Sequence, residues 1–414
     1  MKLNEDQTSA LETLQSPQNV FLTGAAGSGK SFLLRHYLKD KDPKEFPILA
    51  TTGAAAILVG GRTFHSFFGL GILEGGAKAT VERASKNKRL TKRLRETNAI
   101  IVDEVSMLSA STLSAAEQIA RKARGKSAPW GGLRIIAVGD FCQLPPVNAF
   151  YGSSRKKEWA FLDPCWQTSE FTPAILREPM RSSDPEFLKT LNLIRYGHLN
   201  QKVRTFLDER TAPIPETFSG TRLYSRRADA EFKNLELLTK LNGDEHIFET
   251  NYRGNAKSIE AFKKHAPIPE SITLREGALV MLRQNDPKQR WVNGSIGYLR
   301  EIHPLHLGIE LLNGRDIAVE RADFTLLDAD GLPAVTASNF PVTLAYALTI
   351  HKAQGTTLDA MTVDLRGLWE PGQAYVALSR ARDPSKIWIE GWSAKSIFLD
   401  KQVYQFHREL VKPT

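Results

Sequence analysis

A phosphate-binding loop is the feature that most constrains how this chain can fold. Residues 24–31 read GAAGSGKS and lie between the apolar segment NVFLT (19–23) and the helical run SFLLRHYLKD (31–40). Glycines leave backbone N–H groups open to phosphates, a lysine reaches the terminal oxygens, and a hydroxyl can hold Mg²⁺. A glycine-rich loop alone is often a flexible connector, but here the strand and the helix that the pattern requires flank it. The residues assigned to this nucleotide site are Gly24, Gly27, Ser28, Gly29, Lys30 and Ser31.

An acidic pair follows a second apolar segment. Asp103 and Glu104 end the sequence IIVDE at residues 100–104. Asp103 can hold Mg²⁺ through water, and Glu104 can orient and deprotonate an attacking water. Such a pair is common on protein surfaces, but after an apolar strand it is the expected partner of the loop. The two motifs together predict hydrolysis of a nucleoside triphosphate.

Composition sets the broad class of the protein. The 414 residues are 42% hydrophobic, which suits a soluble globular protein with two or more cores. Cys142 and Cys165 are the only cysteines, too few for a disulfide framework or a zinc site, and we expect a cytoplasmic protein. The N-terminal residues 1–14 are polar and helical in pattern, so neither a signal peptide nor a membrane anchor is expected. The net charge of +9 permits polyanion binding without proving it.

Strand and helix signals alternate in two regions, which predicts an α/β fold with two parallel-sheet domains. In the first region we expect strands at 19–23, 46–52, 98–103 and 133–139. In the second we expect helices at 185–209 and 226–241, with strands near 220–224 and 247–252. The predicted domains are residues 1–175, and residues 176–267 together with 337–414.

Two insertions interrupt these domains. Residues 268–336 contain apolar segments at 277–284, 295–303, 305–312 and 315–320, with the turn dipeptides Asn293-Gly294 and Asn313-Gly314 between them. Asn-Gly between apolar segments is a strong hairpin signal, so we expect a small antiparallel barrel. Residues 70–97 contain the basic helical stretch RASKNKRLTKRLRE (83–96), for which a DNA contact and a solvated helix face are equally good interpretations.

Two further segments bear on what the hydrolysis does. GDFCQLPPV at 139–147 contains Gln143, whose amide could sense the γ-phosphate with its donor and its acceptor, although the segment could also be an ordinary proline-rich turn. GQAYVALSRARD at 372–383 contains Arg380, which could form a surface salt bridge. An arginine delivered from the second domain to the loop in the first would instead stabilise transition-state charge and couple hydrolysis to domain closure.

The order of these motifs resembles a known family. GAAGSGKS, ATTGAAA (50–56), GRTFHSFFG (61–69), VDEVSML (102–108), GDFCQLPPV, LAYALTIHKAQG (344–355) and YVALSRA (375–381) are similar to the motif series of superfamily-one helicases. More narrowly, the chain resembles the Pif-type (petite integration frequency) DNA helicases of class B, with RecD-type enzymes as near relatives. The segment 115–136, with Trp130-Gly131-Gly132, resembles the stretch that marks the Pif group.

The resemblance implies two RecA-like domains, dependence on ATP and Mg²⁺, and 5′-to-3′ translocation on single-stranded DNA. It also implies that the inserted barrel is an SH3-like domain and that residues 70–97 are a wedge that separates strands. The residue roles it carries over are adenine recognition by Gln7, binding of the phosphates and Mg²⁺ by Lys30 and Ser31, catalysis by Asp103, Glu104 and Gln143, and arginine fingers at Arg181 and Arg380. Relatives commonly have glutamine after the first of these arginines, where this chain has Ser182.

Other residues could contact the DNA strand. The candidates are Thr51, Thr52 and Gly53 for phosphates and Phe64, His65 and Phe68 for bases. Pro146, His351 and Lys352 are further candidates for DNA binding, and Gly355 is assigned to the nucleotide. Core packing is the alternative for the phenylalanines, and for at least one of Phe64, Phe67 and Phe68 we favour it. His65 could equally be a buried hydrogen-bonding histidine.

The expected partners are single-stranded DNA and duplex or forked DNA with a 5′ tail, with guanine-quadruplex DNA a further candidate. We expect a monomer that binds no membrane, associated with the nucleoid if the source is bacterial. Two rival interpretations stay open: a translocase that strips proteins without separating strands, and a nucleotide-gated DNA-binding module that hydrolyses too slowly to move.

Overall fold

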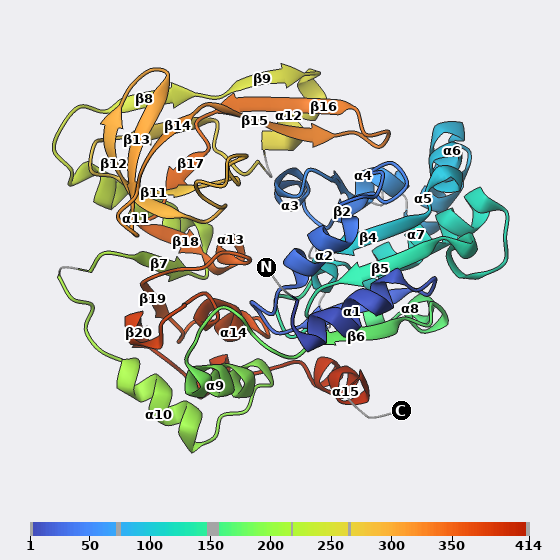
Figure 1. The fold of residues 1–414 in the computed structure, drawn as a ribbon, viewed down its shortest axis with the longest axis horizontal. Helices are drawn as coiled ribbons and strands as arrows, with labels where there is room; N and C mark the ends of the chain where they lie inside the picture. The colour runs from blue at the N-terminus through green and yellow to red at the C-terminus, as the bar shows by residue number, and fades with distance from the viewer. Residues whose placement is uncertain (1–2, 72–75, 147–156, 217, 264–265, 411–414) are drawn as a thin grey trace. The chain divides into compact units, whose positions relative to one another are not determined.

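The computed structural model describes residues 3–71, 76–146, 157–216, 218–263 and 266–410 (Figure 1). The chain forms two compact units. Unit 1 comprises Met1–Met180, Thr325–Ala334 and Asp400–Thr414, and unit 2 comprises Arg181–Phe324 and Val335–Leu399. In the part of the chain that the structure describes, no helix is long and apolar enough to cross a membrane.

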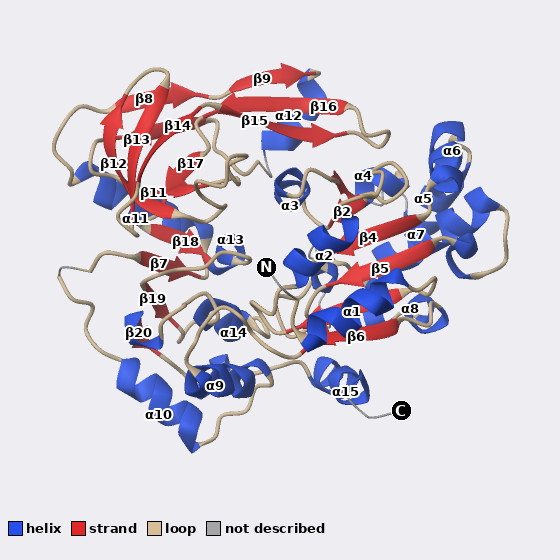
Figure 2. Cartoon of the chain, in the orientation of Figure 1, coloured by secondary structure: helices blue, strands red, loops and turns tan. Residues whose placement is uncertain are grey.

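Unit 1 is built on a six-stranded parallel sheet. The strand order is β3-β2-β4-β5-β1-β6, and Figure 2 shows these strands in red with helices in blue. Its strands are β1 (Val20–Gly24), β2 (Ile48–Ala50), β3 (Arg62–Thr63), β4 (Ala99–Asp103), β5 (Arg134–Val138) and β6 (Thr172–Leu176). Its helices are α1 (Glu5–Gln15), α2 (Lys30–Leu38), α3 (Gly53–Leu58), α4 (Phe64–Phe68), α5 (Gly76–Ser85), α6 (Lys88–Glu96), α7 (Ala110–Arg124), α8 (Pro164–Thr168) and α15 (Lys401–Leu410).

Both faces of this sheet are covered by apolar side chains. On one face, Leu14 of α1 and Leu33 of α2 join a buried cluster with Leu22 of β1. On the other face, Phe21 of β1 contacts Phe141 and Phe406, with ring centroids 5.5 and 6.0 Å apart. A parallel strand buried on both faces is expected to be continuously apolar, as Val20, Phe21 and Leu22 of β1 are. The sheet therefore holds the loop after β1 and the acidic end of β4 on a rigid support.

Unit 2 contains a smaller parallel sheet of order β18-β7-β19-β20. The sheet comprises β7 (Thr221–Tyr224), β18 (Ala347–Thr349), β19 (Met361–Asp364) and β20 (Ile387–Gly391). The helices of this unit are α9 (Pro185–Arg195), α10 (Gln201–Arg210), α11 (Arg227–Thr239), α12 (Ala256–Lys263), α13 (Ile350–Ala353) and α14 (Gln373–Leu378). The start of α9 is fixed by its sequence, because the Asp184 side chain accepts hydrogen bonds from the first backbone N–H groups and Pro185 follows.

An antiparallel β-module is inserted into unit 2. A five-stranded sheet has the order β14-β13-β12-β11-β17, and smaller sheets pair β10 with β8 and β15 and β9 with β16. The bounds are β8 (His246–Glu249), β9 (Asn251–Gly254), β10 (Ser271–Leu274), β11 (Leu279–Leu282), β12 (Ile296–Ile302), β13 (His306–Leu311), β14 (Asp316–Glu320), β15 (Ala322–Leu327), β16 (Pro333–Asn339) and β17 (Val342–Leu344). Gly294 and Gly314 have φ values of 92° and 78°, as the two predicted Asn-Gly turns require.

The mixed α/β class and the predicted hairpins are confirmed, but the boundaries differ from our expectation. The segment near 247–252 was expected in the parallel sheet, whereas β8 pairs antiparallel with β10 inside the β-module. The module is an open five-stranded sheet with smaller partners, and its description as an SH3-like barrel is not confirmed. Residues 325–334 and 400–414 were expected with the barrel and the second domain, but they group with unit 1.

Candidate functional site

The phosphate-binding loop joins β1 to α2 in unit 1, as predicted. Gly24, Gly27 and Gly29 have φ values of 155°, 78° and 91°, which side-chain-bearing residues rarely adopt. A Cβ at Gly29 would lie 2.7 Å from the amide nitrogen of Gln7, so the glycine also makes room for that side chain. Gln7 is buried and its backbone N–H donates to Asn4 Oδ1 at 2.8 Å, which fixes it at the start of α1. The predicted nucleotide residues of unit 1 therefore lie together around one loop, whereas Gly355 belongs to unit 2.

Lys30 folds onto this loop. Its Nζ donates to the carbonyl oxygens of Gly24 at 2.8 Å and Ala25 at 3.1 Å, so the ammonium lies where phosphate oxygens would be cradled. The hydroxyl of Ser28 is buried without a hydrogen-bond partner among the described residues. A buried hydroxyl without a partner costs free energy. The buried Ser28 hydroxyl therefore fits a loop in which a bound ligand supplies the missing hydrogen bond. The donor set of N–H groups, ammonium and hydroxyls suits a triphosphate.

The acidic pair lies at the end of β4. Asp103 accepts a hydrogen bond from the Glu104 backbone N–H at 2.9 Å. Burial raises the pKa of Asp103, while that hydrogen bond and the charge of Lys30 act against the rise. Glu104 has a φ of 53°, a left-handed conformation that is costly for a glutamate and that often marks a functional position. The charge of Lys30 acts on Asp103, so the acidic end of β4 lies near the phosphate-binding loop.

Gln143 follows β5 in the same unit. Its backbone N–H donates to the Asp140 carbonyl at 2.9 Å, and its side-chain nitrogen lies 3.4 Å from Asp140 Oδ2. Asp140 itself is fully buried, and no sequence pattern had assigned it a role. Pro146, which was predicted to contact DNA, is also buried, so its ring offers no exposed surface to a strand. Val147 of the same proline-rich segment lies outside the described residues.

The two predicted arginine fingers belong to unit 2, where Arg181 is partly buried and Arg380 is fully buried. Arg181 donates from Nε to Thr357 Oγ1 at 3.1 Å and from Nη1 to the Ser379 carbonyl at 2.6 Å. Arg380 is 1% exposed and donates from Nε to the Val376 carbonyl at 2.7 Å. Burial lowers the pKa of Arg181, but a guanidinium stays charged at neutral pH. Both side chains meet at Ser379, whose hydroxyl accepts from Arg380 Nη2 at 2.7 Å.

The predicted phosphate-contacting residues of unit 1 lie at the start of α3. The Thr52 hydroxyl accepts from the Ala55 backbone N–H at 3.2 Å and so caps this helix. The Thr51 hydroxyl is buried without a partner among the described residues. Thr51 and the backbone of Gly53 therefore remain the better candidates for phosphate contacts, since the Thr52 oxygen is already used.

The aromatic side chains of α4 are in the core. Phe64, Phe67 and Phe68 are all 0% exposed, and Phe68 lies 4.8 Å from Phe64 and 6.1 Å from Trp130 between ring centroids. The prediction that Phe64 and Phe68 reach DNA bases is therefore wrong, and the packing alternative holds for all three phenylalanines. Burial lowers the pKa of His65, so its ring is neutral at pH 7.

Trp130 anchors the segment that marked the Pif group. It is fully buried, its backbone N–H donates to Glu117 Oε1 at 3.1 Å, and its indole N–H donates to Ser169 Oγ at 2.7 Å. Trp130, Gly131 and Gly132 have successive positive φ values of 57°, 63° and 72°. The segment is therefore a tight structural turn between α7 and β5.

The Trp130→Ala variant is expected to lose about 3–5 kcal/mol of unfolding free energy, because it leaves a cavity and removes the indole that donates to the buried Ser169 hydroxyl. Chemical denaturation followed by far-ultraviolet circular dichroism measures this loss. Trp369→Ala is the matched control, since Trp369 is 52% exposed. Equal stability of the two variants would contradict the anchoring role.

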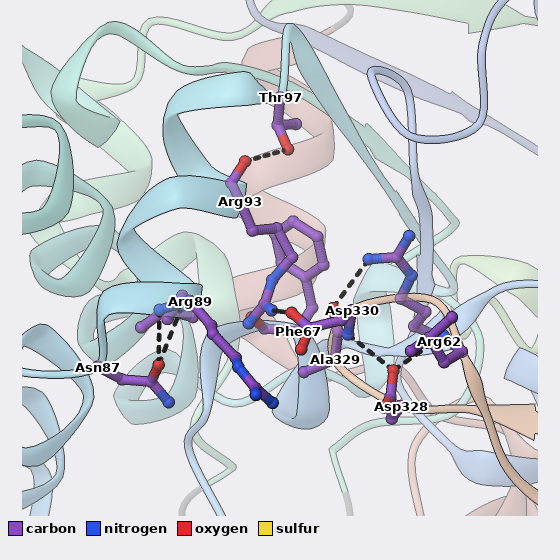
Figure 3. A network of polar contacts seen from close by, with 11 residues as sticks. Arg62, Phe67, Asn87, Arg89, Arg93, Thr97, Asp328, Ala329 and Asp330 are labelled. Carbon is purple, nitrogen blue, oxygen red and sulfur yellow. Dashed lines mark hydrogen bonds and ion pairs between the residues drawn. The ribbon is translucent and has the colours of Figure 1, made fainter.

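Residues 76–97 of the predicted wedge contact α4 and the turn between β15 and β16 (Figure 3). Arg93 of α6 donates from Nη2 to the Phe67 carbonyl at 2.7 Å and pairs with Asp330 at 2.5 Å. Arg62 donates to the Ala329 carbonyl at 2.9 Å. Figure 3 shows both guanidinium groups around the Phe67 ring. Arg93 is therefore an internal residue, and the basic stretch 83–96 is not one uniform face. Residues 72–75 of the predicted insertion lie outside the described residues.

The predicted DNA-binding residues of unit 2 lie in a short helix. His351 and Lys352 belong to α13, whose first turn is capped by the Thr349 hydroxyl, which accepts from the Lys352 backbone N–H at 3.2 Å. Burial lowers the pKa of Lys352, and the charges of Arg227 and Arg283 lower it further. Glu231 acts in the opposite direction, so three cations surround one acid and the excess positive charge suits a phosphate. Gly355 follows α13 with a φ of 81° and lines a cavity of about 450 Å³ within unit 2.

Known proteins are similar to this chain in sequence and in fold. The family model of PIF1-like helicases matches residues 2–204. The ATP-dependent DNA helicase Pif1 of Bdellovibrio bacteriovorus is 47% identical over 409 residues, which cover 99% of this chain and 92% of that protein. Bacteroides sp Pif1 in complex with ADP-AlF4 superposes with a TM-score of 0.84 at 27% identity, covering 99% of this chain and 97% of that one. Bacteroides Pif1 bound to ssDNA has a TM-score of 0.67 at 27% identity with the same coverage. The chain accordingly belongs to the PIF1-like helicase family.

Proposed function

We propose that this protein is an ATP-dependent DNA helicase that translocates 5′ to 3′ on single-stranded DNA and unwinds duplex or forked DNA. The observation that carries the proposal is the loop around Lys30, with Asp103 and Glu104 in the same unit, in a chain that is 47% identical to a named helicase. Single-stranded and forked DNA are supported as partners by the Pif1 structures bound to ssDNA and at forked dsDNA. The monomeric state, the guanine-quadruplex partner and a cytoplasmic, nucleoid-associated location stay predictions.

The predicted site residues divide the chemistry of hydrolysis among them. The N–H groups of the loop and Lys30 bind the phosphates. Ser31 and Asp103 would hold Mg²⁺, which would supply positive charge to neutralise the phosphates. Glu104 orients the attacking water and accepts its proton. Gln7 recognises the adenine. Arg181 and Arg380 supply positive charge to the transition state, as arginine fingers do.

The proposed DNA-binding groups carry little sequence information. Thr51 and Gly53 in unit 1 and His351 and Lys352 in unit 2 offer hydroxyl, N–H and cationic groups to phosphates. Such groups make binding tolerant of sequence and sensitive to salt. Each of these two groups of residues lies in the same unit as residues proposed to bind or hydrolyse the nucleotide. A change of nucleotide state can therefore change how tightly each unit binds the strand.

Steady-state ATP hydrolysis with and without single-stranded DNA tests this proposal. A motor requires strong stimulation by the strand, and this stimulation should decline as salt is raised, since salt weakens binding to phosphates. A nucleotide-gated binding module predicts slow hydrolysis at every DNA concentration. Hydrolysis that is fast but indifferent to DNA would contradict both.

The exposed cations of the wedge separate a helicase from a translocase that does not unwind. We expect replacement of Lys86, Lys88, Arg89 and Lys92 by glutamine to abolish unwinding of forked DNA and to leave DNA-stimulated hydrolysis intact. Each of these cations that binds a phosphate should add about one unit to the salt slope of fork binding, so the slope should fall in the variant. Arg93 is left unchanged, because its replacement would uncouple α6 from the Phe67 carbonyl.

A control variant carries the same charge change elsewhere on unit 1. It replaces four exposed lysines outside the wedge with glutamine: Lys39, Lys44, Lys122 and Lys126. Unwinding should survive in this control. If the wedge variant and the control unwind forked DNA equally well, the basic stretch is only a solvated helix face.

A further inference from the structure

The C-terminal helix α15 is a fixed part of unit 1. The Asp400 carboxylate accepts from the Gln402 backbone N–H at 2.8 Å and from the Trp159 indole N–H at 3.2 Å, which holds the start of the helix. Phe406 stacks on Phe161 with ring centroids 4.4 Å apart and lies 5.4 Å from Phe141. The helix therefore packs on the segment that precedes Gln143 rather than fraying into solvent.

This packing brings a histidine to the buried acid beside Gln143. His407 is 4% exposed, and its Nε2 lies 3.7 Å from Asp140 Oδ1, within ion-pair distance. The same oxygen accepts from the Cys142 backbone N–H at 3.1 Å. The other oxygen, Oδ2, faces the Gln143 side-chain nitrogen at 3.4 Å. Asp140 thus connects α15 to the residue predicted to sense the γ-phosphate.

The chemistry of a carboxylate fixes the direction of the Gln143 amide. An ionised carboxylate only accepts hydrogen bonds, so the NH₂ group of Gln143 must face Asp140. The contact with Asp140 therefore restricts the amide to one orientation. A polar group that is already oriented needs no reorganisation at the moment of reaction.

We propose that His407 is a positioning residue for ATP hydrolysis, which acts through Asp140 to hold the Gln143 amide in its productive orientation. The inference rests on the proposed ATPase function and extends it to a helix outside the recognised motifs. Residues that orient a functional side chain without touching the substrate commonly contribute about 10–100-fold to activity, as the hydrogen-bond partners of metal-ligating side chains do.

The test compares kcat and KM for DNA-stimulated ATP hydrolysis in three variants of the full chain. His407→Leu is expected to lower kcat by about 10-fold or more, with KM for ATP unchanged. His407→Gln should recover most of the activity, since its amide can place an N–H near the position of the imidazole Nε2. Val403→Ala is the matched control, because Val403 is a fully buried residue of α15 that offers only packing.

A double-mutant cycle separates positioning from general loosening of the helix. In the Gln143→Ala background, His407→Leu should cause little further loss of kcat, because the residue on which it acts is gone. Additive losses, or an equal loss of kcat in Val403→Ala, would overturn the proposal.

Two further results have distinct meanings. If the wild-type protein shows no DNA-stimulated hydrolysis, the proposed function fails. If the wild-type protein shows this hydrolysis and the His407→Leu variant has the same kcat, only the inference about His407 fails.

The metal content of the dialysed protein is also measured, because the ligand atoms of Asp140, Cys142 and His407 lie within 4.8 Å of one another. A stoichiometric bound metal would overturn the positioning role.

Discussion

Replacing Arg380 with alanine is expected to slow ATP hydrolysis about 10³–10⁵-fold while ATP still binds, which is the usual contribution of an arginine finger. The physical reason is that a guanidinium stabilises charge that develops on the transferred phosphoryl group only in the transition state. The measurement is kcat under saturating ATP and single-stranded DNA, together with the Kd of a fluorescent nucleotide.

Arg380 is also a structural residue, and the controls must account for that. Its guanidinium donates to the Val376 carbonyl and the Ser379 hydroxyl, so its removal takes one hydrogen-bond donor from each of these two buried groups. Melting temperature is therefore measured together with kcat. Arg382→Ala is the matched control, because Arg382 is exposed two residues further along the chain. Near-normal turnover in a folded Arg380→Ala protein would remove this arginine from the chemistry.

The second large effect is expected for Lys30→Ala. Its ammonium lies against the carbonyls of Gly24 and Ala25 in the phosphate-binding loop. Removing this charge should reduce ATP turnover by about 10³-fold or more, because a preorganised cation at the phosphates disappears. Binding of single-stranded DNA in the absence of nucleotide should stay within about twofold of the wild type, since other residues bind the strand.

The Lys30 experiment has an internal control near the same helix. Lys39 is exposed just past the end of α2, so Lys39→Ala should hydrolyse ATP normally. Turnover by steady-state assay and DNA binding by fluorescence anisotropy are measured for both variants. Loss of DNA binding as well as turnover in Lys30→Ala would indicate misfolding or a misassigned site.

Local chemistry made much of unit 1 predictable from the sequence. The loop after β1 needs glycines at positive φ, and the strand before Asp103 is buried on both faces, so both leave strong local patterns. The Asn-Gly turns of the β-module are equally local, because Gly294 and Gly314 supply the required positive φ. These features depend on neighbours in the chain and not on distant partners.

Features made by distant segments were missed. The pairing of Arg93 with Asp330 joins residues 237 positions apart. His407 and Asp140 also lie in distant segments, and no hydrophobic pattern in either segment indicates that the two side chains approach each other. The burial of Phe68 also depends on Trp130, which reaches it from beyond α7. No pattern in the sequence states which distant side chain will cover an aromatic ring or face a carboxylate.

Unwinding of matched 5′-tailed and 3′-tailed duplexes with ATP is the experiment that decides whether this protein is a motor with a fixed direction. We expect the wild-type protein to separate the 5′-tailed duplex, to fail on the 3′-tailed and blunt duplexes, and to stop when ATP is replaced by a non-hydrolysable analogue. Separation of the 3′-tailed duplex alone would contradict the direction of movement. Failure on every duplex, in a protein whose ATP hydrolysis ignores added strand, would contradict the motor itself.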